Sequence, residues 1–518
     1  MKNLPISIQT FSDLMTQDYL YVDKTKEINN LFARGGKYYF LSRPRRFGKT
    51  LLVSTLKEIF SGNKELFKGL WIYDKIQWEV FPVIDIDFLG LKYETQSELI
   101  DTLEYLIDQN AAQQGIELKE KGYDKRFKEL IIKTSQKNKA VILVDEYDKP
   151  IIDFIETEEK EIALANRKVL KKFYSVLKSA DEYIRFVFVT GVSKFSRVSI
   201  FSDLNNLYDI TIDDNFSTLL GLTQDELLKY FDDRIDWLSQ KMKMSKNVFL
   251  ENVKQWYNGY SWDGSHFLYN PHSILNFFSK NRFSNYWFAS ATPTFLINHM
   301  KKRKKDITAL EREEVDEAIF ESYDIENLEV LSMLFQTGYL TIKDIIPVGI
   351  KSKYVLSYPN EEVKESFLKH FLASYTTEET GIVGSKILDL VEAAGKDDLE
   401  NFFIIIKSLF ASIPSHIFIE NREAYYHTVI YLVLKLLGVY IEVEVHTNKG
   451  RIDAVIETES HIYILEFKMG TSDEALSQIE ERKYHEKYLS SGKSIQLIGV
   501  GFDEKEKNIS DYKEKTIK

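Results

Sequence analysis

The chain of 518 residues contains no cysteine. Structural disulfides and cysteine-ligated zinc are therefore excluded, and a reducing compartment is the simplest expectation. No apolar run approaches the roughly 18–20 residues that a helix needs to cross a bilayer. The N-terminal residues MKNLPISIQTF lack the apolar core of a secretion signal. We therefore expect a cytoplasmic protein that does not enter a membrane.

Excess positive charge and metal-binding histidine patterns are also missing. The 79 acidic residues outnumber the 68 basic residues, which gives a net charge of −11. Nucleic-acid binding thus has no global support, although a local basic groove would suffice for it. The nine histidines include no HExxH spacing, so nothing indicates a zinc hydrolase. The length of 518 residues suits about three or four domains, and the apolar content of 44% is enough for large cores.

Residues 38–52, YYFLSRPRRFGKTLL, predict an apolar strand, a turn and a helix. Such a turn directs backbone N–H groups and a helix N-terminus toward phosphate oxygens. Lys49 would reach the β- and γ-phosphates of ATP, and the Thr50 hydroxyl would ligate Mg²⁺. The usual pattern is GxxxxGK[ST], and an arginine occupies its first glycine position. We expect the whole turn to bind the nucleotide through Arg43, Pro44, Arg45, Arg46, Phe47, Gly48, Lys49 and Thr50.

A second buried strand begins at Ala140 and ends in two adjacent acids, Asp145 and Glu146. Ligands of open parallel sheets bind at the carboxyl ends of the strands. Asp145 is therefore expected to hold Mg²⁺, and Glu146 is expected to polarise the attacking water as a general base. Solvated acids at a strand end are common, but the two motifs in this order favour a nucleotide site. The run VFPVIDIDF at 80–88 predicts a further strand of the same sheet.

The stretch IRFVFVTGVSKFSRV at 184–198 predicts another buried strand, which ends at Thr190. Thr190 would sense the γ-phosphate, unless its hydroxyl is simply satisfied at the strand end. Lys194 and Arg197 follow in the loop. Either one is a candidate for a charge-stabilising finger, in cis or from a neighbouring subunit, or only a solvated base near the phosphates. A finger that acts in trans would require a homo-oligomer.

These motifs resemble those of bacterial and archaeal AAA-ATPase-like proteins that carry a C-terminal PD-(D/E)XK nuclease domain. In that family the RPRRFGKT form is usual, so the extra arginines would add positive charge beside the phosphates or contact a lid. The resemblance also implies that residues 21–24, with Tyr21 among them, lie near the nucleotide base; a plain helix boundary is the alternative. The matching segments are FSDLMTQDYLYVDKT (11–25), RPRRFGKT (43–50), VDEYDKP (144–150), TGVSKFS (190–196), WYNGY (256–260), YNPHSIL (269–275), FQTGYLTI (335–342) and YPNEEV (358–363).

The middle of the chain opens with LTQDELLKYF at 222–231, where Thr223 and Glu226 form a capping pattern. A helical region is expected from there to about residue 350. Within it, VLSMLFQTGYLTIKDI predicts a helix, a turn at Gly338 and a short strand, which is compatible with a winged-helix-like unit. Such a unit would bind DNA or serve only as an ATPase lid. The basic cluster at 301–305 would contact a phosphate backbone or form a solvated helix face.

Near the C-terminus, three charged residues fall on two predicted strands. Asp453 follows a turn, while Glu466 and Lys468 are two apart on an apolar strand and therefore face the same side. Two carboxylates suit Mg²⁺ or Mn²⁺. Lys468 would help to form hydroxide or would stabilise a pentavalent phosphate. A surface strand with alternating charges is the alternative.

The order of a helix acid, GRID, ExK and a helix with QxxxxxY resembles the PD-(D/E)XK nuclease superfamily. This resemblance implies that Glu423, Asp453 and Glu466 hold the metal and that Glu466 and Lys468 are catalytic. Gln478 and Tyr484 would lie on the following helix. Some members of the superfamily bind nucleic acid without cutting it.

The expected fold is α/β in four parts: a P-loop ATPase domain with a parallel sheet flanked by helices (1–220), a helical lid with a winged-helix-like unit (221–350), a helical connector (351–415) and an α/β PD-(D/E)XK nuclease-like domain (416–518). The expected function is hydrolysis of ATP with Mg²⁺, which regulates a metal-dependent nuclease acting on nucleic acid, most simply DNA. Defence or mobile-DNA handling is the associated context. The alternative, mildly favoured by the acidic net charge, is a nucleotide-regulated binding or scaffold protein with a catalytically silent nuclease fold.

Overall fold

The computed structural model of the chain describes two compact units. The first comprises Met1–Ser290 and Leu310–Glu362, and the second comprises Ala291–Ala309 and Val363–Lys518. The described residues are 1–33, 35–156, 159–194, 200–201, 204–288, 294–303, 305–321, 329–414, 422–448, 451–503 and 505–517, with the side chains of 156, 321, 422–425, 444–448, 451–453 and 484 left out. Within these ranges, none of the helices combines the length and the apolar character that a membrane span requires.

The first unit is built on the parallel sheet that the sequence predicted, and its strand order is β2-β3-β4-β1-β5. Strands β1, β3 and β4 are almost entirely buried, as expected for strands that are covered on both faces. The strand bounds are β1 Tyr38–Ser42, β2 Val83–Asp87, β3 Ala140–Asp145, β4 Ile184–Gly191 and β5 Tyr208–Asp209.

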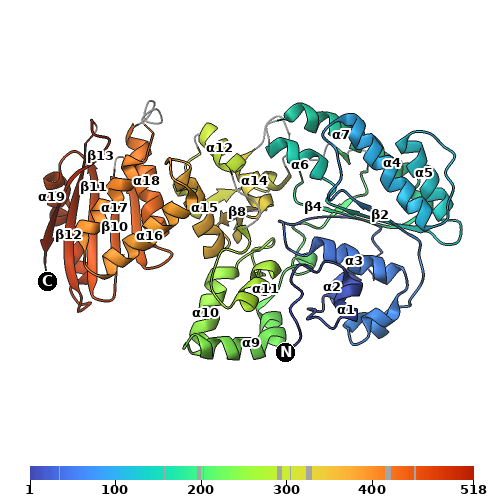
Figure 1. Ribbon diagram of the computed structural model, residues 1–518, viewed down its shortest axis with the longest axis horizontal. Helices are drawn as coiled ribbons and strands as arrows, with labels where there is room; N and C mark the ends of the chain where they lie inside the picture. Colours follow the sequence, from blue (N-terminus) through green and yellow to red (C-terminus); the bar gives the residue numbers. More distant parts are fainter. Residues whose placement is uncertain are drawn as a thin grey trace. The chain divides into compact units, whose positions relative to one another are not determined.

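Helices cover both faces of this sheet (Figure 1). Helix α3 (Lys49–Phe60) lies on one face together with α1 (Phe11–Thr16) and α2 (Thr25–Ala33). The apolar side of α3 packs on alternate residues of β1, β3 and β4, in a core that includes Leu41, Leu52, Leu56, Leu143 and Phe188. The opposite face carries α4 (Gln96–Gln113), α5 (Tyr123–Thr134), α6 (Lys149–Glu156) and α7 (Lys160–Ser179). This packing fixes where β1 and α3 meet.

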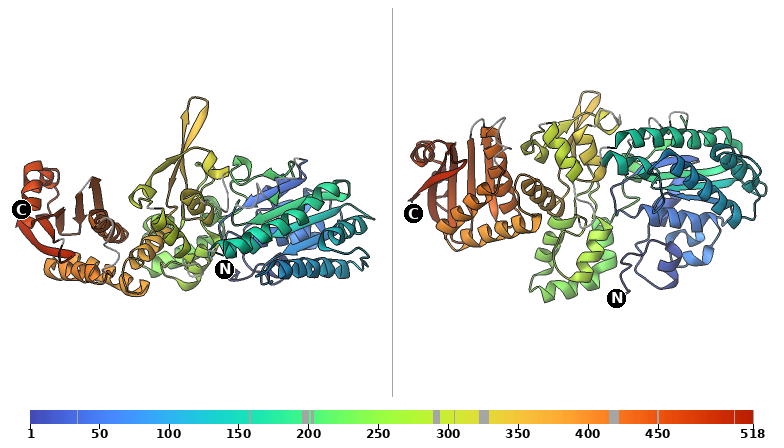
Figure 2. Two further views of the ribbon diagram at one scale, coloured as in Figure 1. Left: turned by 90° about the horizontal axis from the view of Figure 1, so that it is seen from above. Right: turned by 45° about the horizontal axis from the view of Figure 1, so that its top comes forward.

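The remainder of the first unit is helical with a small sheet of order β6-β8-β7. The predicted helix and strand around Gly338 are present: α14 ends at this residue, whose φ is 90°, and β7 follows. Strands β7 and β8 form a long hairpin (Figure 2). The elements are α9 Gln224–Lys241, α10 Lys246–Tyr257, α11 Pro271–Lys280, β6 Glu313–Val315, α13 Ala318–Glu321, α14 Val330–Thr337, β7 Thr341–Val348 and β8 Lys351–Ser357.

Strand β8 occupies the first residues of the range 351–415, for which only helices were expected. The reason is visible in its sequence, KSKYVLS, where Lys351 and Lys353 are exposed and the intervening residues are less so. This alternation has the period of a strand. Elsewhere in both units short 3₁₀ turns occur at Lys64–Phe67, Trp71–Asp74, Asp181–Tyr183, Asp214–Phe216, Thr308–Glu311 and Tyr484–Tyr488.

The second unit contains a mixed sheet of order β13-β12-β11-β10-β9, in which only the β11–β12 pair is parallel among the described pairs. Helix α17 packs on one face, where Phe403 stacks on Tyr512 at 4.1 Å. Helix α19 packs on the other, where Ile479 joins Ile462 and Ile464. The strands are β9 Glu442–Asn448, β10 Arg451–Glu457, β11 His461–Met469, β12 Ser494–Asp503 and β13 Asn508–Thr516.

The remaining helices of the second unit are α12 (Thr294–Lys302), α16 (Thr380–Gly395), α17 (Leu399–Ala411), α18 (Arg422–Leu437) and α19 (Ser472–Arg482). Helix α15 (Glu361–Ala373) begins with the last two residues of the first unit and continues into the second. It is therefore a covalent connection between the two units.

Candidate functional site

The predicted phosphate cradle lies between the end of β1 and the start of α3. Its residues 43–50 are called the P-loop below. Arg46 and Gly48 have φ values of 69° and 93°, in the left-handed region. Lys49 is buried, and its Nζ donates hydrogen bonds to the backbone oxygens of Arg43 (3.1 Å) and Pro44 (3.3 Å). The lysine thus lies over the turn, with the N-terminus of α3 beneath it.

The two predicted acids approach the P-loop from the end of β3. The Thr50 side chain lies beside the Asp145 carboxylate, and Glu146 Oε1 lies 3.9 Å from Lys49 Nζ. Burial raises the pKa of Asp145 to about 6 against the opposing effect of Thr50. Glu146 has a φ of 51°, and its backbone N–H donates to Asp145 Oδ1 at 2.9 Å. The structure therefore brings Lys49, Thr50, Asp145 and Glu146 together.

Thr190, the predicted phosphate sensor, is fully buried at the end of β4. Its hydroxyl donates to the backbone oxygen of Leu41 at 2.8 Å. The contact holds β4 against β1 at the level of the P-loop. Of the two roles considered for this residue, this contact corresponds to a satisfied strand-end hydroxyl.

Sequence reasoning missed Asp148, which lies two residues after Glu146. Its carboxylate is fully buried and accepts hydrogen bonds from Ser193 N and Ser193 Oγ, both at 2.7 Å. Burial raises the pKa of Asp148 to about 6. A Cβ at Gly191 would lie only 2.3 Å from Asp148 Oδ1. The third acid of DEYD, Asp148, and the glycine of TGVS were thus the available signals for this contact.

Lys194, one of the two finger candidates, is engaged inside the first unit. Its Nζ forms a buried ion pair with Asp209 at 2.8 Å, and its backbone N–H donates to Gln336 Oε1 at 2.7 Å. The loop after β4 is thereby attached both to β5 and to α14. Arg197, the other candidate, lies outside the described residues.

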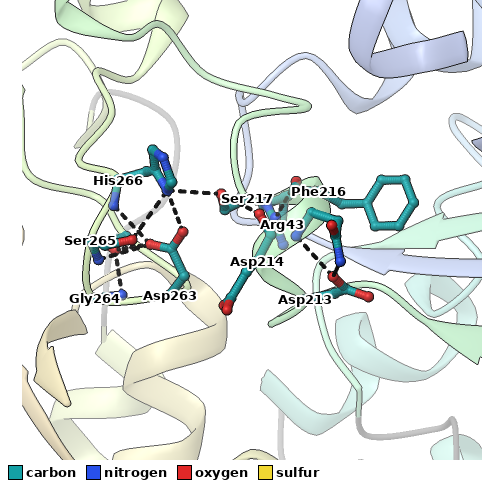
Figure 3. A network of polar contacts seen from close by, with 11 residues as sticks. Arg43, Asp213, Asp214, Phe216, Ser217, Asp263, Gly264, Ser265 and His266 are labelled. Atoms are coloured by element: carbon teal, nitrogen blue, oxygen red, sulfur yellow. Dashed lines mark hydrogen bonds and ion pairs between the residues drawn. The ribbon is translucent and has the colours of Figure 1, made fainter. Parts of the chain in front are cut away.

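Arg43 turns its side chain into the protein (Figure 3). The guanidinium donates to the backbone oxygens of Thr211 (2.7 Å) and Phe216 (3.5 Å), and it lies 4.0 Å from the ring centre of Trp262. Burial lowers the pKa of Arg43 to about 9, which leaves the group charged at neutral pH. This arginine ties the start of the P-loop to the segment after β5 and to the middle region.

The same network contains a serine, a histidine and an aspartate that do not form a nucleophilic triad. Asp263 Oδ2 lies 2.5 Å and Ser217 Oγ lies 3.4 Å from the same ring nitrogen, His266 Nδ1. A triad requires the acid and the nucleophile on opposite nitrogens of the ring. Asp263 also accepts from the backbone N–H groups of Ser265 and His266 (Figure 3). The cluster therefore fixes a turn beside Arg43.

The other P-loop residues also contact the middle region of the first unit. Arg46 donates to the backbone oxygen of Tyr286 at 3.0 Å, and Trp287 Nε1 donates to the backbone oxygen of Arg45 at 3.2 Å. The Phe47 ring packs edge-on against Tyr260 at 4.8 Å. A Cβ at Gly338 would meet Pro44 at 2.8 Å. The contacts of Arg43 and Arg46 are thus those of the lid interpretation.

A mainly apolar cavity of about 120 Å³ adjoins the P-loop at Gly48. The N-terminal segment contributes Tyr21 to its wall. At its edge Lys24 Nζ donates to the backbone oxygen of Thr218 and pairs with Glu226 at 2.7 Å. The cavity is lined by residues that include Val22, Leu51, Leu52, Leu220, Leu222 and Pro271.

In the second unit, Asp453 and Glu466 are cross-strand partners on β10 and β11. Glu466 is fully buried, and Gln478 Nε2 of α19 donates to its Oε1. Lys468 Nζ lies 3.7 Å from Glu474 Oε2. The structure thus places Glu466, Gln478 and Lys468 under or beside α19.

Three residues of the predicted nuclease motifs have only their backbones described. The side chains of Glu423, Asp453 and Tyr484 lie outside the described residues, although their backbones belong to α18, β10 and the turn at Tyr484–Tyr488. Among the side chains that the structure does describe, no three His, Cys, Asp or Glu residues are close enough together to hold a metal ion.

Two glycines of β12 were missed by the sequence reasoning. Gly499 and Gly501 are the β12 partners of Glu466 and Lys468. A Cβ at Gly499 would lie 2.3 Å from the backbone oxygen of Ser472, and one at Gly501 would lie 2.7 Å from that of Gly470. Both glycines therefore allow α19 to approach the sheet closely. The signal was the spacing IGVGF, which puts both glycines on one face.

Residues 5–201 match the family described as predicted AAA-ATPase, and residues 421–512 match the PD-(D/E)XK nuclease superfamily. A curated relative from Azotobacter chroococcum mcd 1, an uncharacterized protein in the vnfD 5′ region, is 36% identical over 524 residues. The match covers 99% of this chain and 98% of that protein. This chain belongs to the AAA-ATPase-like family with a C-terminal PD-(D/E)XK nuclease domain.

Membership of this AAA-ATPase-like family confirms the predicted pairing of a P-loop unit with a nuclease-superfamily unit. Among solved structures, Cdc6p from Pyrobaculum aerophilum is similar over 67% of this chain and 93% of that chain, with 10% identity. Its TM-score of 0.26 is too low to establish a shared overall fold.

Proposed function

We propose that the first unit binds and hydrolyses ATP at the P-loop. The observation that carries this proposal is the meeting of Lys49, Thr50, Asp145 and Glu146 at the carboxyl ends of β1 and β3. Lys49 Nζ would exchange the loop oxygens of Arg43 and Pro44 for β- and γ-phosphate oxygens. Glu146 would accept a proton from the attacking water.

The oxygens of Thr50 and Asp145 suit Mg²⁺, which prefers one or two such ligands together with phosphate oxygens. The ion would neutralise charge on the phosphates when bound. Protonation of Asp145 would remove the negative charge that attracts Mg²⁺. Its pKa of about 6 means that this protonation takes place as the pH falls toward 6. We therefore expect Mg²⁺-dependent nucleotide binding to weaken as the pH falls below about 6.

The cavity beside Gly48 is the proposed place for the base. Its apolar wall suits a flat aromatic ring, and its position next to the P-loop at Gly48 supports this assignment. Tyr21 and Pro271 would contact the base from two different segments. The ion pair of Lys24 with Glu226 holds the N-terminal segment to the first turn of α9 beside this cavity.

Equilibrium binding of a fluorescent ATP analogue tests the nucleotide site. Lys49→Ala is expected to weaken binding at least tenfold, since a charged donor to the phosphates is lost. Lys57→Ala is the matched control: it removes a lysine from the same helix, where Lys57 pairs with Asp85 at 2.8 Å. Equal affinity of the Lys49→Ala protein and the wild type would show that the cradle is misassigned.

We further propose that the second unit cleaves phosphodiester bonds of nucleic acid, with DNA as the first candidate, and that ATP regulates it. The support is the register that pairs Asp453 with Glu466, with Lys468 on the same strand face as Glu466. Asp453 and Glu466, with Glu423, would hold Mg²⁺ or Mn²⁺, which would activate a water for attack on phosphorus. Lys468 would stabilise charge on the phosphate.

Incubation of the full chain with linear and single-stranded DNA tests this second site, with Mg²⁺ or Mn²⁺ and with or without ATP. Lys468→Ala should abolish cleavage, whereas Lys513→Ala, which removes a lysine of β13 that pairs with Asp473, should not. The acidic net charge of −11 favours the alternative, a silent fold that only binds. Absence of cleavage under every condition would support that alternative. The expected cytoplasmic location, oligomeric state and mobile-DNA context stay predictions.

A further inference from the structure

A continuous set of hydrogen bonds connects the P-loop to the first turn of α15. Arg46 Nη1 donates to the backbone oxygen of Tyr286 at 3.0 Å. The backbone N–H groups of Tyr286 and Trp287 both donate to Glu362 Oε1, at 2.6 and 2.8 Å. Glu362 is fully buried and lies in the first turn of α15. This set of contacts is called the relay below.

The P-loop end of the relay is a strained residue. Arg46 has a φ of 69°, a conformation that glycine adopts freely and that other residues adopt only when their surroundings impose it. Its guanidinium also meets His272 Nε2 at 2.5 Å. Asn276 Nδ2 faces the same nitrogen at 3.2 Å, so this nitrogen is the acceptor of the ring. Burial, followed by Arg46, lowers the pKa of His272 to about 4, which keeps the ring neutral.

The Glu362 end of the relay contacts α11, the helix that carries His272. Ser273 Oγ donates to Glu362 Oε2 at 2.7 Å, and Ser273 follows His272 in the first turn of α11. Asn270 Oδ1 fixes this turn by accepting from the backbone N–H groups of both residues. Arg46 and Glu362 are therefore held by the same turn of α11 as well as by Tyr286. A displacement at one end is opposed at the other unless both move together.

We propose that Arg46 and Glu362 are positioning residues that make the first turn of α15 respond to the conformation of the P-loop. The proposal rests on the proposed ATP binding, because phosphate is what would draw Lys49 and the loop N–H groups into new contacts. Arg46 lies three residues before Lys49, so its Cα shifts with them. Through Tyr286 the shift reaches Glu362. Helix α15 continues to Ala373, which carries the response into the second unit.

Amide hydrogen exchange of the full chain, read by mass spectrometry with and without a non-hydrolysable ATP analogue, tests the relay. In the wild type the peptide 361–373 is expected to change its exchange rate severalfold when the analogue binds. Arg46→Ala should bind more weakly and show no change there. Arg46→Gly should bind more tightly than Arg46→Ala, since glycine adopts the left-handed conformation without an anchor, yet the peptide should still be unresponsive. Arg45→Ala, with the same loss of charge, should retain the response.

Variants at the far end separate the relay from nucleotide binding. Glu362→Ala should bind the analogue within about threefold of the wild type, because it touches no P-loop atom, and should lose the response of peptide 361–373. Glu362→Gln should retain the response, because its amide oxygen accepts from Tyr286 and Trp287. Glu361→Ala is the matched control and should respond.

The outcomes are distinguishable. If the wild type binds no nucleotide, the proposed ATP site is wrong. If it binds and peptide 361–373 does not respond, or if Arg46→Gly or Glu362→Ala responds as the wild type does, the relay is overturned while the ATP site stands. Circular dichroism of each variant confirms that it is folded. If Glu362→Ala is not folded, Glu362→Gln keeps the test decisive.

Discussion

Replacing Glu362 by glutamine should make the first unit less sensitive to pH. The carboxyl is completely buried, and it accepts hydrogen bonds from three neutral donors, Tyr286 N, Trp287 N and Ser273 Oγ. Burial, only partly offset by these donors and by Arg46, raises the pKa of Glu362 from 4.5 to about 7. Glutamine preserves the size and the acceptor oxygen but cannot ionise.

The sign and the size follow from linkage. Between pH 4.5 and about 7 the folded chain holds a proton on Glu362 that the unfolded chain has lost, so the free energy of unfolding falls as the pH rises. A shift of this size corresponds to about 3 kcal/mol in total, of which about 2 kcal/mol falls between pH 5 and pH 8. The Glu362→Gln protein lacks this contribution and should gain about 2 kcal/mol over the wild type across that interval.

Urea denaturation followed by tryptophan fluorescence measures this difference in the relevant unit. All six tryptophans lie between residues 71 and 287, within the first unit. Glu361→Gln serves as the control for a change of charge at the start of α15. If the stability difference between Glu362→Gln and the wild type is the same at pH 5 and pH 8, the carboxyl is ionised in the folded chain and the reasoning about its burial is refuted.

Three further changes test other contacts. Gly499→Ala should destabilise the second unit by about 1–3 kcal/mol, because its Cβ meets the backbone of α19, and calorimetry should show the loss in one transition only. Asp148→Ala should cost about 2 kcal/mol or more and lower ATP turnover, because the buried N–H of Ser193 loses its acceptor; full turnover would contradict its role. Asp263→Asn should cost more stability at pH 7 than near pH 2. Burial opposes the effect, but backbone and side-chain hydrogen bonds from His266 hold the pKa of Asp263 below its ordinary range; an equal loss at both pH values would contradict this.

The local elements of the ATP site were predictable from the sequence. The apolar run before Gly48 and the run before Asp145 each specify a buried strand, and the residue types that follow specify phosphate and metal chemistry. The structure confirms the parallel sheet that unites these strands. It could be predicted because apolar strands separated by helical segments have few alternatives to a parallel sheet. In the nuclease-superfamily unit, the two-residue spacing of Glu466 and Lys468 sufficed to predict that both side chains lie on one face of a strand.

The direction of the P-loop side chains could not be predicted. Arg43 and Arg46 are both basic residues next to a phosphate cradle, so charge alone points them toward the nucleotide. Their partners, Trp262 and Tyr286, lie more than 200 residues later in the chain. Only tertiary packing brings these partners to the P-loop, and no local pattern records it. The same holds for Glu362, whose sequence context is that of an ordinary first turn of a helix.

The proposed ATPase activity of the P-loop unit requires Glu146 to activate water. Phosphate release from ATP and Mg²⁺ by the wild type, Lys49→Ala and Glu146→Gln proteins tests it most directly, with analogue binding measured on the same samples. We expect the wild type to hydrolyse ATP, Lys49→Ala to bind poorly, and Glu146→Gln to bind ATP while its turnover falls by a factor of about 100 or more. Undiminished phosphate release by the Glu146→Gln protein would contradict the account.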